Sequence, residues 1–176
     1  NEYRQEGNIK GLFYTSPGLE TNHLKYGSMA LVTAAEHTTV KPEWLKGAWW
    51  DGAHNFWDDF CEDGKLEAKS EYIAVESKFN AKPNLRIGSL GISEKIRPQE
   101  EKVFEFIITW YFPNRPKAWE GHICPADNHK KEIEKNYYST LFRDAWHCAD
   151  YLVTNLTRLE KASGDFHKAL FTTTLP

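Results

Sequence analysis

The chain has 176 residues, of which 40% are apolar and 14% aromatic, a content that supports a packed core and excludes a disordered chain. The formal net charge is −3, and Lys and Arg are scattered among Asp and Glu, so we expect no nucleic-acid partner. Three widely spaced cysteines, Cys61, Cys124 and Cys148, do not form the pattern of a disulfide-rich secreted domain, and they predict reduced thiols and a cytoplasmic location.

No apolar run reaches the roughly 18 residues that a membrane-spanning helix needs. The first ten residues also lack the apolar segment of a signal peptide. The sequence begins without Met and stops just after a segment patterned as structured protein. We therefore expect a soluble fragment of a longer chain, and peripheral contact with a membrane stays open.

The first half of the chain is typical of strands separated by turns. Ile9 to Ser16 and Ser28 to Val40 are rich in small, β-branched and aromatic residues, and a Pro-Gly pair follows the first of them. After a stretch rich in tryptophan, Asp58 to Gly64 predicts one or two helical turns that end at the glycine. Residues 65–84 read as loop, with one further strand at Tyr72 to Phe79.

The middle of the chain predicts a hairpin. Ser89 to Ile96 and Val103 to Phe112 are strand-like, and the polar connection between them contains Pro98, which favours a turn. One face of the second strand is apolar at period two and is predicted to form the buried spine of a sandwich core. Its residues are Phe104, Phe106, Ile108, Trp110 and Phe112.

The pattern changes towards the C-terminus. Pro113 to Pro116 interrupts the strand, and irregular polar residues continue as a linker to about Lys131. From about Ile133 to Ala162 apolar residues step by fours and threes, which predicts one long helix, interrupted after it by Ser163-Gly164. The predicted fold is β followed by α: an antiparallel β-sandwich portion with its linker over 1–131, and helices over 132–176.

Several short segments together resemble a known family. They are Tyr26-Gly27-Ser28-Met29-Ala30-Leu31, Phe56-Trp57-Asp58-Asp59-Phe60, Glu62-Asp63-Gly64, Gly88-Ser89-Leu90-Gly91, Trp110-Tyr111-Phe112-Pro113-Asn114-Arg115, Asn136-Tyr137-Tyr138-Ser139-Thr140 and Phe142-Arg143-Asp144-Ala145-Trp146. In this order they resemble the end of the N-terminal β-sandwich and the opening helices of the catalytic region in family 116 glycoside hydrolases. This is the β-glucosidase and non-lysosomal glucosylceramidase family.

The resemblance implies a retaining β-glycosidase in which the sandwich supports an (α/α)6 helical barrel, and residues 132–176 would begin that barrel. It implies no cofactor. The family's catalytic Glu and Asp would lie beyond this chain, so no residue here inherits a catalytic role. The implied partners are the rest of the same protein and a β-glucoside or a glucosylceramide-like substrate. The alternative is a non-catalytic β-sandwich module that binds carbohydrate or protein.

Two groups of residues are candidates for contact with substrate. Asp58 and Asp59 belong to an acidic cluster that includes Glu62 and Asp63, and the interpretation we favour is that this cluster caps and solvates a turn beneath the tryptophans. Contact with the catalytic domain is a further alternative. The spacing of the cluster does not fit a calcium loop. The second group, Trp49, Trp50 and Trp57, could stack on sugar rings, and the alternative is packing in a core or interface.

A metal site is not predicted. His122, Cys124 and His129, with His147 and Cys148 farther on, offer the donor types that zinc prefers. Their spacing lacks the close pairs of a closed zinc site, so ordinary loop and helix positions are the better interpretation. Asn155-Leu156-Thr157 fits a glycosylation sequon, but the predicted helix places it where glycosylation is not expected.

Overall fold

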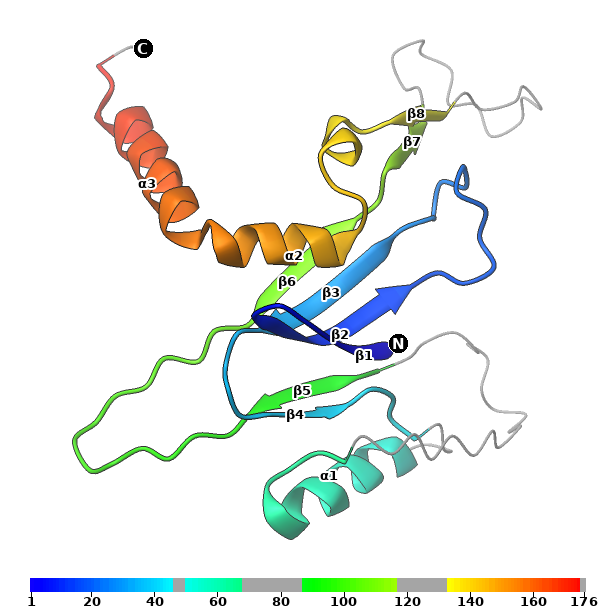
Figure 1. Cartoon of the computed structure of the whole chain (residues 1–176), viewed down its shortest axis with the longest axis vertical. Helices are drawn as coiled ribbons and strands as arrows, with labels where there is room; N and C mark the ends of the chain where they lie inside the picture. Colours follow the sequence, from blue (N-terminus) through cyan, green and yellow to red (C-terminus); the bar gives the residue numbers. More distant parts are fainter. Residues whose placement is uncertain (46–49, 68–86, 117–132, 175–176) are drawn as a thin grey trace.

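The computed structural model describes residues 1–45, 50–67, 87–116 and 133–174 (Figure 1). Antiparallel strands come first and the two C-terminal helices follow, which confirms the predicted order of β followed by α. The strands are β1 (Glu2–Glu6), β2 (Ile9–Thr15), β3 (Ser28–Thr33), β4 (Thr38–Lys41), β5 (Ser89–Ile92), β6 (Ile107–Tyr111), β7 (Asn114–Pro116) and β8 (Ile133–Lys135). The helices are α1 (Asp51–Asp63), the 3-10 helix η1 (Tyr137–Thr140), α2 (Ala145–Thr154) and α3 (Leu156–Thr172).

The largest sheet has four antiparallel strands in the order β1-β2-β3-β6. A tight turn at Gly7, with φ of 58°, joins the first two strands. Phe13 lies opposite Ala30, and Ala30 lies opposite Thr109, so these three residues share one face of the sheet. Because alternate residues of a strand point to opposite faces, this register decides which side of every strand enters the core.

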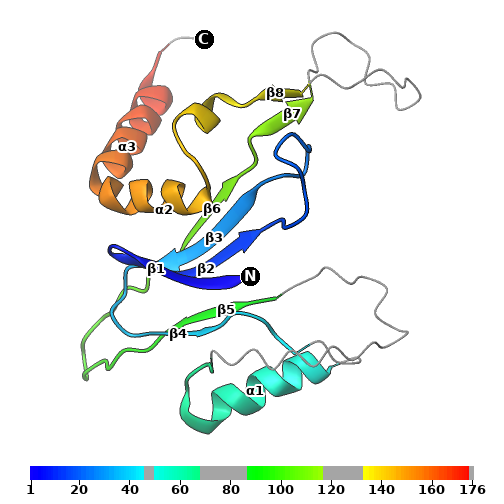
Figure 2. The ribbon, with the colours of Figure 1, turned by 45° about the vertical axis from the view of Figure 1, so that its right-hand side comes forward.

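Helix α2 covers that face (Figure 2). Trp146 is 1% exposed and packs edge-on against Phe13, with ring centroids 6.3 Å apart. The helix begins where Asp144 accepts a hydrogen bond from the His147 amide at 2.8 Å, the usual way in which an aspartate caps a helix. Its first residue, Ala145, donates from its amide to the Ser28 hydroxyl, and this bond fixes the helix on β3.

Strands β4 and β5 form a separate pair on the other side of β2 (Figures 1 and 2). Leu12 is fully buried there, and a Cβ placed on Gly88 would lie only 2.8 Å from its side chain. Helix α1 lies beyond this pair. The molecule is therefore layered as α2, the four-stranded sheet, the β4–β5 pair and α1.

The predicted hairpin of Ser89 to Ile96 with Val103 to Phe112 is wrong. A turn does form at Pro98, closed by a hydrogen bond from the Glu100 amide to the Arg97 carbonyl. The two strands nevertheless pair elsewhere, β5 with β4 and β6 with β3. The sequence located both strands and the turn. Strands far along the chain compete with the neighbouring strand for pairing, and hydrophobic periodicity does not say which strand becomes the partner.

The predicted burial of Phe104, Phe106, Ile108, Trp110 and Phe112 is also wrong. Ile108 is 60% exposed and Trp110 is 63% exposed, whereas Tyr111 on the opposite face is buried in the core. Both faces of β6 are partly apolar, so the pattern alone cannot select one. Contacts with β3 and α2 decide which face of β6 is buried, because Ile107 and Thr109 continue the face that Ala30 and Val32 present to the helix.

The single helix predicted over about Ile133 to Ala162 is replaced by four elements, β8, η1, α2 and α3. The linker contributes a short strand as well, because β7 pairs with β8. Tyr138 and Phe142 of the apolar stripe still pack against the core, although they precede α2. Ser163-Gly164 does not interrupt the helix, because α3 continues through both residues.

Two smaller differences concern element bounds. Residues 28–40 form two strands, β3 and β4, and α1 is longer than the predicted helical turns while still ending at Gly64. The strand predicted at Tyr72 to Phe79 lies outside the described residues. Within the described ranges, no helix combines the length and the apolar character needed to cross a membrane. The division at residue 131, with barrel helices after it, stays a prediction.

Candidate functional site

Helix α1 carries four of the residues predicted to contact substrate or to flank its site. The chain leaves the helix through Gly64, whose left-handed conformation (φ 75°) lets its amide bond back to the Phe60 carbonyl. Trp50 stands at the N-terminal end, and Trp57, Asp58 and Asp59 lie within the helix. Trp49 lies outside the described residues.

The two aspartates of α1 have different surroundings. Asp59 accepts an ion-pair hydrogen bond from Lys41 of β4 at 2.9 Å, and the two side chains are only 13% and 7% exposed. It also accepts a hydrogen bond from the Glu67 amide. Asp58 is exposed and points roughly 100° away around the helix. Asp59 therefore fastens α1 to β4, and the neighbouring carboxylates do not face one site.

The aromatic residues around α1 divide into an inner and an outer set. Trp44 stacks on Phe56 at 4.6 Å and donates from its indole N–H to the Ser89 hydroxyl, so these rings join α1 to β5. Trp50 and Trp57 form the outer set, 65% and 56% exposed. The structure therefore leaves two of the predicted tryptophans on the surface, where a flat ligand can reach them.

The donors considered for zinc do not come together in the described part of the chain. His122, Cys124 and His129 fall outside it, and no group of three metal-binding side chains is found within it. His147 accepts a weak bond at Nδ1 from the Arg143 amide. Cys148 packs against the core, where burial and then the Asp144 carboxylate raise the pKa of its thiol.

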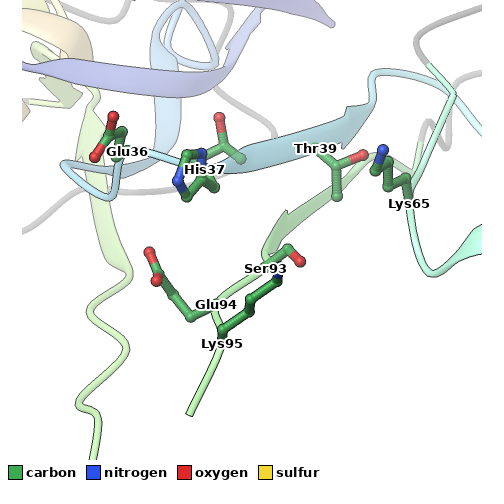
Figure 3. Close-up of a pocket in the computed structure, with 8 residues that line it drawn as sticks. Glu36, His37, Thr39, Lys65, Ser93, Glu94 and Lys95 are labelled. Atoms are coloured by element: carbon green, nitrogen blue, oxygen red, sulfur yellow. The ribbon is translucent and has the colours of Figure 1, made fainter. Parts of the chain in front are cut away.

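A polar cleft of about 680 Å³ lies where β4 begins and β5 ends (Figure 3). We call this feature the polar cleft. Three separate parts of the chain build it. They are residues 36–39, residues 93–95 and Lys65, which follows Gly64 at the end of α1. Its lining consists of Glu36, His37, Thr38, Thr39, Lys65, Ser93, Glu94 and Lys95.

The polar cleft carries charges of both signs. Glu36 and Glu94 lie towards one end with Lys95 beside Glu94, and Lys65 lies towards the other end (Figure 3). The one ion pair formed by a lining side chain in the described ranges joins Glu94 to Lys102 at 3.9 Å. Sequence analysis missed this site because its residues come from distant segments and no local motif connects them.

A second surface feature lies on the large sheet. Met29 of β3 and Ile108 and Trp110 of β6 project on the side opposite α2, where the β4–β5 pair packs against β2, and we call these three residues the exposed sheet face. Each is at least 41% exposed. This face is the one that the sequence predicted to be core.

Comparison with known proteins gives the family. Residues 1–159 match the model described as beta-glucosidase 2, glycosyl-hydrolase family 116 N-term. A search of curated proteins gives no significant match. The family match covers all of the described strands and reaches into α3. The chain belongs to glycosyl-hydrolase family 116 and corresponds to the N-terminal region of that family.

Proposed function

We propose that this chain is the supporting region of a retaining β-glycosidase that acts on β-glucosides or glucosylceramide-like substrates. The observation that carries the proposal is the match of residues 1–159 to a family region described as the N-terminal part of a β-glucosidase. The catalytic Glu and Asp belong, in this proposal, to a helical region outside the present sequence.

The arrangement of the acidic residues supports a non-catalytic role. Retaining hydrolysis needs two carboxyl groups about 5–5.5 Å apart, one protonated and one ionised, on either side of the scissile bond. Asp59 is held by Lys41, and Asp58 lies exposed on another side of the helix. A carboxylate that an ion pair keeps ionised is poorly suited to donate a proton, and Asp58 and Asp59 do not face one site across which a glycosidic bond could lie.

The exposed sheet face is the surface that we assign to the catalytic region. Soluble monomers seldom leave a contiguous apolar patch larger than a few hundred Å² uncovered. Trp110 and Met29 lie opposite each other on adjacent strands, and Ile108 is one alternation farther along β6. Packing against helices of the catalytic region would bury this row of side chains. Through that contact the present chain would support the catalytic region.

The test compares this chain with the intact protein on a chromogenic β-glucoside. We expect no turnover above buffer from the chain alone and clear turnover from the intact protein, with the β-anomer of glucose as first product by proton NMR. Trp110→Lys in the intact protein should lower the melting temperature and the activity. The matched control Trp57→Lys changes a tryptophan on α1 that is 56% exposed, against 63% for Trp110, and should leave both unchanged. Turnover by the chain alone, abolished by Asp58→Asn, would contradict the proposal.

A second function is favoured by one observation. Trp50 and Trp57 are both more than half exposed, which suits a module that binds carbohydrate without cleaving it. An experiment on the intact protein distinguishes the two functions. Sugar binding that Trp57→Ala abolishes, without any hydrolysis, would support the binding module.

A further inference from the structure

We propose that the polar cleft binds a neutral sugar through the hydroxyl groups of the sugar. The proposal rests on the proposed function, since it deepens the role of this chain in a carbohydrate-active protein. It places a contact for carbohydrate at a site that is separate from the exposed sheet face and built from other elements.

The frame of the polar cleft is fixed by hydrogen bonds in which backbone groups take part. The Ser93 amide donates to the His37 carbonyl at 3.1 Å and extends the β4–β5 pairing past both strands. The Thr39 hydroxyl is bound to both the amide and the carbonyl of Leu66, which holds the segment after α1. Lys10 donates to the Glu36 carbonyl. A frame held in this way needs little reorganisation when a ligand enters.

Several side chains at the cleft are available to a ligand. Among the described residues, Glu36, Lys65 and Lys95 make no ion pair or side-chain hydrogen bond, and neither do the His37 ring and the Ser93 hydroxyl. Ionised carboxylates offer only acceptors, and ammonium groups offer only donors. The cleft therefore presents both kinds of group without satisfying them internally.

This mixture selects the class of ligand. Two carboxylates, Glu36 and Glu94, and two ammonium groups, Lys65 and Lys95, line the cleft, so their charges largely cancel and the lining carries no net charge that would favour an anion or a metal cation. An apolar ligand would leave these charges without hydrogen-bond partners. A sugar hydroxyl can donate to a carboxylate and accept from an ammonium group at the same time, so a polyhydroxylated neutral molecule satisfies both ends.

The size of the polar cleft agrees with this class. Its volume of about 680 Å³ lies inside the range of small-molecule sites and leaves room for more than one pyranose ring. The lining side chains are largely exposed, so water competes for each hydrogen bond and the affinity should be modest. We expect a dissociation constant of about 1 mM for a β-glucoside or a β-linked disaccharide.

The experiment is an amide chemical-shift titration of this chain with methyl β-glucoside and with cellobiose. Saturable shifts should appear at residues 36–39 and 93–95, with affinity unchanged by added salt because the ligand is neutral. The double variant Glu36→Gln with Glu94→Gln should weaken binding about tenfold, since hydrogen bonds to charged acceptors are lost. The matched control, Glu20→Gln with Glu160→Gln, removes the same charge from exposed positions elsewhere and should bind as the original chain does.

Several results would overturn the proposal. They are an absence of saturable shifts in a well-dispersed spectrum, shifts confined to α1 around Trp57, unchanged affinity in the double variant, or tighter binding of the zwitterion glycine than of the glucosides. Hydrolysis by the intact protein is measured separately. Loss of sugar binding at the cleft with hydrolysis retained would therefore refute this inference and leave the proposed function in place.

Discussion

Replacing Trp146 with alanine tests whether α2 and the sheet form one core. The indole is 1% exposed and lies among Phe13, Ala30 and Val32. The Arg4 guanidinium lies over both rings, 3.9 Å from the Phe13 centroid and 5.4 Å from the Trp146 centroid. Truncation would leave a cavity between α2 and the sheet.

The expected cost follows from these contacts. Truncation of a buried Phe or Trp to Ala costs about 3–5 kcal/mol. The indole N–H of Trp146 is buried without a hydrogen-bond partner among the described residues, and alanine removes that penalty. We therefore expect the lower end, about 3 kcal/mol. Trp146→Phe keeps most of the apolar contact and also removes the unpaired donor, so it should cost about 1 kcal/mol or less.

Urea unfolding followed by circular dichroism measures both variants, with Trp57→Ala as the control on an exposed tryptophan. For a chain of this size, 3 kcal/mol corresponds to a fall of roughly 6–12 °C in melting temperature. The control should stay within about 0.5 kcal/mol of the original chain. If Trp146→Ala costs less than about 1 kcal/mol, α2 does not close the core of the sheet, and the reasoning from burial fails.

Three further predictions use the same unfolding assay or a thiol assay. Ile107→Ala should cost about 2 kcal/mol and Ile108→Ala less than about 0.5 kcal/mol, and the reverse order would mean that β6 presents its other face. Lys41→Ala should cost about 3 kcal/mol, because it removes a buried ammonium group from the nearly buried Asp59 carboxylate, and a neutral effect would show that this pair is hydrated. The raised pKa of the Cys148 thiol lowers its thiolate fraction at neutral pH. Cys148 should therefore react with iodoacetamide more slowly than the exposed Cys61, and its rate should rise only as the pH rises. Equal rates at pH 7 would contradict this prediction.

The sequence was a good guide where local chemistry decides the structure. The extent of β2, the end of α1 at Gly64 and the order of β followed by α were all predicted, because β-branched runs, a left-handed glycine and apolar periodicity act over short distances. The family resemblance was confirmed by the match over residues 1–159.

The errors share a physical cause, which is choice among distant partners. β6 has two apolar faces, and the arrival of α2 and of Tyr138, which packs edge-on against Tyr111, decides that Tyr111 is buried and Trp110 exposed. The polar cleft depends on the meeting of residues 36–39 with 93–95, which the pairing of β4 with β5 brings about. The role of Asp59 likewise needed the position of Lys41. No pattern within one segment carries these contacts.

The central claim is that this region supports a glycosidase and does not supply its nucleophile. The direct measurement is mass spectrometry of the intact protein after inactivation with a 2-deoxy-2-fluoro-β-glucoside, which accumulates the covalent glycosyl-enzyme on the nucleophilic carboxylate. The account predicts one labelled glutamate in a peptide outside the 176 residues described by this sequence. A labelled carboxylate within them, with Asp58 as the exposed candidate on α1, would contradict it.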